Sequence, residues 1–302
     1  MKKYNKFLFF ILITPILLIT LCACQNAEVN INYYVDGNLS VAPPDWNFYD
    51  VEKVETDNEK INVSWDNTTW ALQYDEIKKD TQINVYFAYT KSPFKIDGVG
   101  YASLQDAFAS VTDSTSVTIE TTADYEGFGA TPVGSDIILN LNGFTLDGNG
   151  FDTITCNGTL TVNGEGTITN TVLGEYSKSL VNYGTLTINN VTVENTTANV
   201  SVWNSNNGGS IMNINECSIT REQPDCIVVI NSGEMHINSG TIIGAGDKTH
   251  PVVYNNADIA VLHLNGGSIT NTGDGYTVYK DEGEVISNGT EFVNSYGIDV
   301  AE

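Results

Sequence analysis

Positive charge is scarce in this chain of 302 residues. Lys and Arg together number 13 against 37 Asp and Glu, which gives a net charge of −24 at pH 7, and Arg221 is the only arginine. Proteins that bind nucleic acid need basic patches against the phosphate backbone, and recruitment to anionic lipid needs the same. The composition therefore excludes nucleic acid as a partner and excludes electrostatic attachment to an anionic membrane.

Cysteine is also scarce, with five residues in the whole chain, so the protein is not a disulfide-stapled scaffold. Cys156, Cys217 and Cys226 lie beyond the N-terminal segment, and none of them stands in a CxxC pair or beside a histidine. These spacings indicate neither a zinc site nor a cysteine nucleophile. We predict that the three are unpaired, buried side chains.

Only one long apolar run occurs, over residues 7–21, and it follows three lysines near the start of the chain. It is short for a transmembrane helix, which needs about 20 apolar residues, and its layout is that of an export signal. Cleavage near its end would give either a secreted protein or, if a lipid is attached, an anchored one.

The end of this segment, Leu21-Cys-Ala-Cys24, resembles the lipobox of bacterial lipoproteins. The resemblance implies a lipoprotein signal peptide over residues 1–23 and a lipidated Cys24 at the mature N-terminus. Two acyl chains such as palmitate anchor a protein stably where one does not. We therefore expect a membrane partner through the anchor on Cys24, and a protein exported to the extracytoplasmic face of a bacterial cell membrane.

Residues 24–93 are rich in aromatic side chains and contain three alternating, strand-like runs, over 29–35, 61–65 and 83–89, separated by turn signals. This pattern predicts a small antiparallel β-sandwich-like domain. Trp46, Trp65 and Trp70 suit either stacking on sugar rings or packing in the core. A domain of this size needs large side chains in its interior, which favours the core.

One amphipathic helix is predicted, over residues 101–111, just after a boundary at Ser92-Pro93. Its apolar residues recur at helical spacing, and Ser103 is placed as the N-cap. We expect this helix to cover the open apolar end of the domain over residues 94–302.

From residue 136 onward one pattern recurs: two apolar residues around a polar one, then Asn, then Thr or Ser before another apolar residue. The copies cover residues 139–146, 160–168, 186–193, 212–219, 235–242 and 262–269. Repeats of 20 to 30 residues indicate a solenoid, and the strand-like alternation with no helix inside the repeat selects an all-β, single-stranded solenoid, the parallel β-helix.

Stacked coils lie about 4.8 Å apart, so equivalent residues form columns along the solenoid. The recurring asparagines should form a ladder in which each side-chain amide bonds to the next. The predicted ladder consists of Asn142, Asn163, Asn189, Asn215, Asn238 and Asn265.

Residues 96 to about 295 resemble the pectate-lyase-like right-handed parallel β-helix superfamily, and in particular its β-helix modules of bacterial surface proteins. The phrases over 96–107 and 139–146 carry the resemblance. That superfamily includes lyases, hydrolases and adhesins, so the resemblance predicts the fold and leaves the function open.

No catalytic residue is predicted. The Asn-Thr-Asp, Asp-Asp, His-Gly and Arg-Ile-Lys motifs of polygalacturonases do not occur, and the strong negative charge repels polyuronates. Arg221, beside Glu222 and Asp225, suits either a substrate clamp or, as we favour, a loop ion pair.

Two metal hypotheses arise. Asp147, Asn149 and Asp152 have the spacing of a weak calcium site in a turn, and calcium is the one cofactor that the sequence indicates. His236 and His263 should lie about 5 Å apart on one outer face. We interpret that pair as a solvated surface ladder rather than a metal site.

The favoured function is a cell-surface lipoprotein that displays a rigid, non-catalytic β-helix for adhesion, with a glycan or another surface protein as the partner. Trp203, Tyr254 and Tyr276 are the predicted binding residues. The alternatives are a polysaccharide lyase or glycoside hydrolase of the same superfamily, and a structural spacer or assembly component.

Overall fold

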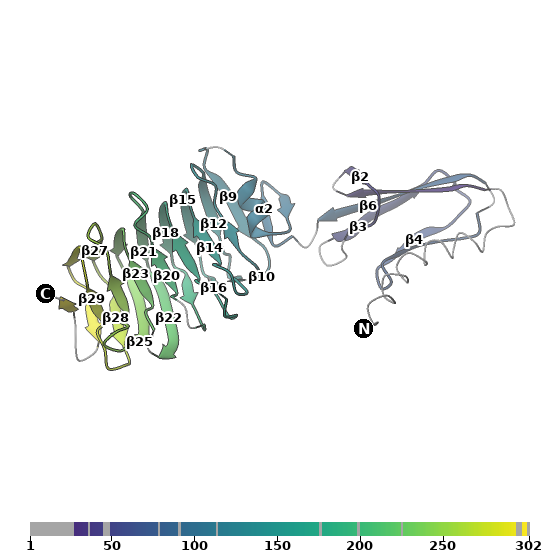
Figure 1. Ribbon diagram of the computed structural model, residues 1–302. Helices are drawn as coiled ribbons and strands as arrows, with labels where there is room; N and C mark the ends of the chain where they lie inside the picture. The colour runs from purple at the N-terminus through teal and green to yellow at the C-terminus, as the bar shows by residue number, and fades with distance from the viewer. Residues whose placement is uncertain are drawn as a thin grey trace, which may run out of the picture. The chain divides into compact units, whose positions relative to one another are not determined.

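A computed structural model describes residues 27–35, 37–44, 49–77, 79–89, 92–112, 114–174, 177–197, 200–224, 226–293 and 298–300. These residues fall into two compact units, which divide between residues 91 and 92. Nearly all of the regular structure is β-strand (Figure 1). No helix among the described residues is long and apolar enough to cross a membrane.

The N-terminal unit contains a four-stranded sheet in the order β2-β1-β6-β3 and a separate hairpin of β4 and β5. The strands are β1 Val29–Val35, β2 Asn38–Ser40, β3 Tyr49–Thr56, β4 Val63–Asp66, β5 Ala71–Tyr74 and β6 Thr81–Tyr89. The prediction of a wholly antiparallel domain was wrong at one pairing, because β1 and β6 run parallel. The long connection between them, which contains β2 to β5, allows this arrangement.

The hairpin covers the sheet through aromatic side chains. The ring of Trp65 meets those of Trp70 and Phe87 edge to face, at centroid distances of 5.3 and 5.1 Å. Phe87 is 2 % exposed. Trp65 and Trp70 therefore belong to the core of this unit, as the domain's small size favours.

The second unit is a right-handed parallel β-helix of about seven turns, formed by three stacks of parallel strands (Figure 1). The first stack begins with β7 Phe94–Ile96, β8 Val99–Tyr101 and β9 Val117–Thr121, and continues with β12 Asp136–Asn140, β15 Thr159–Asn163, β18 Thr185–Asn189, β21 Ile211–Asn215, β24 Glu234–Ile237, β27 Val261–Leu264 and β30 Glu284–Ser287. β7 pairs antiparallel with β8 and β9 at the N-terminal end of the stack.

The other two stacks contain eight strands each. The second consists of β10 Tyr125–Glu126, β13 Thr145–Asp147, β16 Thr167–Thr169, β19 Thr192–Glu194, β22 Cys217–Pro224, β25 Gly240–Ala245, β28 Ser268–Asn271 and β31 Glu291–Val293. The third consists of β11 Gly129–Ala130, β14 Ile154–Cys156, β17 Leu180–Asn182, β20 Val202–Asn204, β23 Val229–Asn231, β26 Val253–Asn255, β29 Val278–Lys280 and β32 Ile298–Val300.

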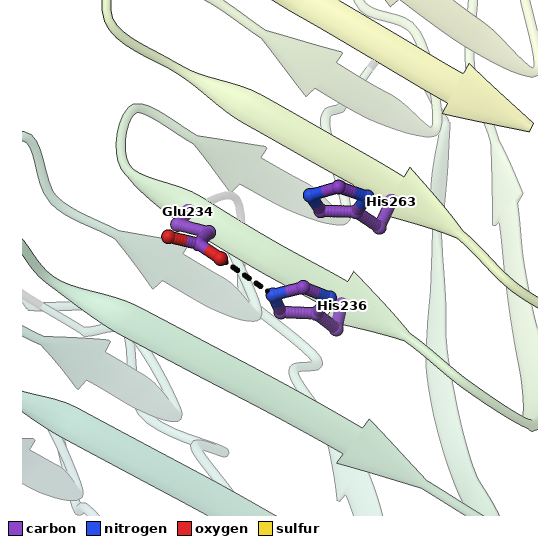
Figure 2. Close-up of side chains that lie close together, drawn as sticks. All are labelled: Glu234, His236 and His263. Carbon is purple, nitrogen blue, oxygen red and sulfur yellow. Dashed lines mark hydrogen bonds and ion pairs between the residues drawn. The ribbon is translucent and has the colours of Figure 1, made fainter.

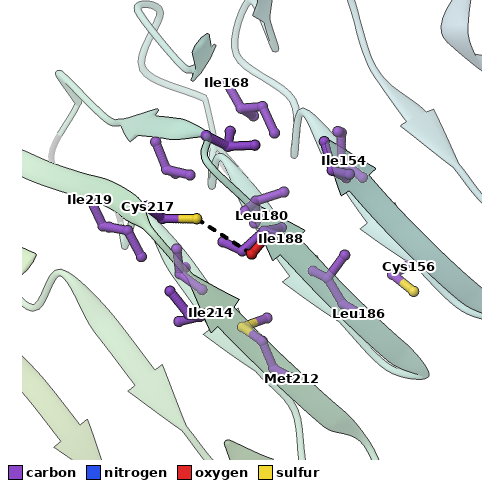
Figure 3. Close-up of a cluster of buried hydrophobic side chains, with 14 of the residues drawn as sticks. Ile154, Cys156, Ile168, Leu180, Leu186, Ile188, Met212, Ile214, Cys217 and Ile219 are labelled. Atoms are coloured by element: carbon purple, nitrogen blue, oxygen red, sulfur yellow. Dashed lines mark hydrogen bonds between the residues drawn. The ribbon is translucent and has the colours of Figure 1, made fainter. Parts of the chain in front are cut away.

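The inward residues of the three stacks form one continuous core. In the first stack the inner column is almost fully buried, at 0 to 2 % exposure, and consists of Leu139, Val162, Ile188, Ile214, Ile237 and Leu264. Figure 3 shows the middle of this core, where side chains of neighbouring coils pack on one another. Burial of each such side chain is worth about 1.5–3 kcal/mol, so the repeated apolar pair stabilises every coil.

The strand register corrects one member of the predicted ladder. Asn140, not Asn142, lies opposite Asn163. β12 ends at Asn140, and Asn142 lies in the turn beyond it with a φ of 54°. The first copy of the pattern has Asn at both positions, and only the pairing decides which of them belongs to the column.

The helix α2 spans Leu104–Ala109 and covers the N-terminal end of the β-helix. The hydroxyl of Ser103 caps it by accepting a hydrogen bond from the Asp106 amide at 2.9 Å. Leu104 and Phe108 are fully buried. A side chain at Gly129 would clash with both of them, so this position on the first coil must be glycine for the helix to lie so close.

Candidate functional site

The outward columns of the three stacks differ in chemistry. The outward column of the first stack is mostly polar and lacks Phe, Trp and Tyr; it consists of Ile138, Thr161, Thr187, Asn213, His236, His263 and Ile286. The matching column of the second stack consists of Thr145, Thr167, Thr192, Ser218, Thr241 and Ser268. The third stack instead presents Trp203, Ile230, Tyr254 and Tyr279 on successive coils, which we call the aromatic stripe. All four are partly exposed. A row of partly exposed apolar and aromatic side chains on one sheet is a candidate binding surface.

Three tyrosines gather at the C-terminal part of the stripe. The rings of Tyr254 and Tyr279 stack at 5.8 Å, and those of Tyr276 and Tyr279 stack at 5.5 Å. The Tyr254 hydroxyl donates a hydrogen bond to Asp281 at 2.8 Å. Burial, together with this hydrogen bond, raises the pKa of Tyr254 to about 12, so its hydroxyl stays protonated at neutral pH. The structure thus brings the predicted residues Tyr254 and Tyr276 together through Tyr279, which the sequence analysis did not identify.

Trp203 lies at the other end of the stripe. Its ring meets Tyr183 edge to face at 6.0 Å, and Lys178 places its Nζ 5.3 Å from the ring centroid. Lys178 also lies 3.7 Å from the Asp152 carboxylate. Burial raises the pKa of Asp152 against the opposing effect of Lys178. Trp203 is therefore held in a fixed orientation by a cation and an aromatic neighbour.

The ladder of the first stack runs along the end of its strands. Each amide Nδ2 donates to the Oδ1 of the preceding coil at 2.8 to 2.9 Å, joining Asn163, Asn189, Asn215, Asn238 and Asn265. Asn142 instead donates to Glu120 at 2.8 Å and to the Thr121 carbonyl at 3.0 Å.

A second asparagine ladder, which the sequence analysis missed, ends the strands of the third stack. Asn182, Asn204, Asn231 and Asn255 are all fully buried, and consecutive amides are joined at 2.8 Å. Each also donates to a backbone carbonyl, as Asn204 does to Glu234 at 2.9 Å. The signal was present, because each of these residues directly follows an outward apolar or aromatic residue: Val181, Trp203, Ile230 and Tyr254.

The predicted ion-pair partners of Arg221, the Glu222 side chain and Asp225, lie outside what the structure describes, so that ion pair stays a prediction. The Arg221 side chain is 3 % exposed, and its two terminal nitrogens donate to the carbonyls of Thr197 and Ile227, each at 2.8 Å. Burial lowers the pKa of its guanidinium. It lines a pocket of about 200 Å³ with Glu194 and Asn195. A group that ties two backbone segments together in this way has a structural role.

The carboxylates of the predicted calcium turn bond to donors of the protein itself. Asp147 accepts hydrogen bonds from the Asn149 amide at 3.0 Å and from the Thr171 amide at 3.2 Å. Asp152 accepts one from the Lys178 amide at 3.0 Å, and its neighbour is the Lys178 ammonium. The Lys178 ammonium beside Asp152 disfavours a calcium ion at that carboxylate. Hydrogen bonds within the protein are therefore the better explanation for the acidic residues of this turn.

The two histidines form a tighter group than the sequence indicates (Figure 2). His236 and His263 lie opposite each other on β24 and β27, and their rings are parallel within 2° at a centroid distance of 4.3 Å. Glu234, two residues before His236 on the same face, brings its Oε1 within 2.8 Å of His236 Nε2. Among the described residues, this is the one group of three His, Cys, Asp or Glu side chains whose ligand atoms converge, within 4.8 Å of one another.

The thiols of Cys156 and Cys217 are buried and unpaired, and that of Cys226 is partly exposed. Burial raises the pKa of Cys156 to about 12 and also raises that of Cys217. Neither thiol is therefore suited to nucleophilic chemistry at neutral pH. Cys24 and Trp46 lie outside the described residues.

Comparison with known proteins gives no match, whether with family models, curated proteins or solved structures. The fold implied by the resemblance to the pectate-lyase-like superfamily is present, while membership of that superfamily stays a prediction.

Proposed function

We propose that this protein is a lipid-anchored surface protein whose β-helix binds a neutral glycan along the aromatic stripe without cleaving it. The observation that carries the proposal is that Trp and Tyr side chains line the outer column of the third stack, whereas the mostly polar outer columns of the other two stacks lack Phe, Trp and Tyr. Aromatic rings pack on the apolar faces of sugars, and neighbouring polar groups hydrogen-bond to the hydroxyls.

Charge selects the class of glycan. The net charge of −24 repels uronate and sulfate polymers, so a neutral glycan is favoured. The Asp281 carboxylate beside Tyr254 and the Asp152–Lys178 pair beside Trp203 supply polar groups at both ends of the stripe. The coils, about 4.8 Å apart, offer an extended ligand a regular series of contacts.

A glycan array probed with the full chain tests this proposal. We expect binding to neutral glycans, and Trp203→Ala and Tyr254→Ala should each weaken it about tenfold or more through the loss of a buried aromatic contact. Phe151→Ala is the matched control, because Phe151 is an exposed aromatic residue, at 56 %, that lies outside the stripe and packs on Phe128. Binding restricted to anionic glycans, no glycan binding, or equal binding by all variants would overturn the proposal.

The lyase or hydrolase alternative requires a free base or acid at the substrate. Arg221, the only arginine, is buried and bonded to backbone carbonyls, which argues against its use as a proton abstractor. We expect the protein to release no unsaturated or reducing ends from pectate, alginate or hyaluronan, with or without calcium. Product that accumulates with time in proportion to the protein added would make it an enzyme.

A further inference from the structure

The group of Glu234, His236 and His263 lies on the first stack, away from the aromatic stripe of the third, and the proposed glycan binding does not use it. We propose that these three side chains form a surface site for a zinc-class divalent cation, with two imidazole nitrogens and one carboxylate oxygen as ligands.

The backbone prearranges the three ligands. His236 and His263 occupy paired positions on parallel strands, and Glu234 points to the same face because it is two residues before His236. The alternate residues of these strands, Met235 and Leu262, are fully buried, so they anchor both strands in the core. Little conformational freedom remains to be lost when a metal binds, which favours affinity.

The distances fit a metal after a small adjustment. Zinc bound tetrahedrally at about 2.0–2.2 Å from each ligand holds neighbouring ligand atoms about 3.4 Å apart. Here Glu234 Oε1 and His236 Nε2 lie 2.8 Å apart, and all three ligand atoms are within 4.8 Å of one another. Because the lone pair of an imidazole nitrogen lies in the ring plane, the two parallel rings of Figure 2 must also tilt toward each other, which rotation about the torsions of these outward side chains provides.

The donor set selects the metal. Two imidazoles and one carboxylate suit zinc and its neighbours in the first transition row, whereas calcium and magnesium take oxygen ligands. Three protein ligands leave a coordination position open to solvent or a partner's donor atom. The net charge of −24 raises the local concentration of cations around the site.

The test is zinc binding by the untagged full chain, measured by competition with a chromophoric chelator. We expect one zinc ion per chain, with saturation below about 100 µM free zinc. His236→Ala and His263→Ala should each lower the affinity at least about tenfold, because loss of a supporting outer-shell group alone already costs that much. Glu234→Gln should weaken binding too, because it removes the carboxylate charge while it keeps the side chain's shape.

His250→Ala is the matched control. His250 is the one other histidine of the chain, and its ring contacts Asp247 in an exposed loop. This variant should bind zinc like the wild type. All of the substitutions change outward side chains, so thermal melts should show each variant folded. Absence of saturable binding in the wild type, full binding by His263→Ala, or equal loss in His250→Ala would each overturn the proposal.

Discussion

At the scale of single residues, asparagine amides do much to hold the coils in register. The ladder from Asn182 to Asn255 is fully buried, and each of its amides bonds to the next coil and to the backbone. Removal of one member leaves one donor or acceptor of each neighbouring amide buried without a hydrogen bond. The ladder from Asn163 to Asn265 is partly exposed, so water can replace a lost partner there.

Asn231→Ala should lower the free energy of unfolding by about 3 kcal/mol, because it removes the acceptor of one buried Asn204 N–H and the donor to the buried Asn255 Oδ1. Asn215→Ala, in the partly exposed ladder, should cost about 1 kcal/mol. Asn206→Ala, at an exposed loop position, serves as the control. Thermal denaturation, monitored by circular dichroism, ranks the three variants by stability. Equal melting temperatures for Asn231→Ala and Asn206→Ala would contradict the prediction.

The sequence predicted the first ladder because each asparagine directly follows the same triplet of an apolar, a polar and an apolar residue. It missed the second because those strands are only three residues long and are separated by loops of variable length. Glu234 was missed for a different reason: it lies two residues before His236 on the same face, in a different column from the two histidines.

The buried thiols give a second prediction at this scale. Burial raises the pKa of Cys156 to about 12, so at pH 8 the thiol form dominates and the reactive thiolate is almost absent. Cys156 and Cys217 should therefore escape alkylation in the native protein and react fully after unfolding. Peptide mapping by mass spectrometry measures this, and rapid labelling of Cys156 in the native state would show that the coil around it is open.

At the scale of elements, the repeat was enough to predict the strands of the β-helix. The two apolar residues of each copy must point inward, and they stack on the two of the next copy. The N-terminal unit is harder to predict, because the pairing of β1 with β6 joins residues about 50 positions apart and no local pattern specifies its direction. The helix α2 was predictable from its apolar spacing and from Ser103, both of which are local signals.

The helix also has a measurable role as a cover. Phe108→Ala should lower the free energy of unfolding of the β-helix by about 3–5 kcal/mol, because it opens a cavity between α2 and the first coil. Val99→Ala is the comparison, since Val99 is 60 % exposed and should change little. Chemical denaturation measures the unfolding midpoint of each variant, and Phe108→Ala should have the lower one. Similar midpoints for the two variants would show that α2 does not seal the core.

At the scale of the whole molecule, the account combines an acidic, rigid β-helix with the predicted lipid anchor. Cys24→Ser should remove the acyl site and shift the protein from the membrane fraction to the soluble fraction of cells that process the signal. Fractionation with immunodetection measures the shift. Equal partitioning of wild type and Cys24→Ser would refute lipidation at this residue.

The central claim is that the aromatic stripe of the third stack binds a neutral glycan. Affinity electrophoresis in gels that contain soluble neutral polysaccharides tests it most directly, with the wild type, the double variant Trp203→Ala/Tyr254→Ala and the Phe151→Ala control run side by side. The account predicts that at least one polysaccharide retards the wild type and the control while the double variant migrates as in a plain gel. Equal mobility of all three proteins in every gel would contradict it.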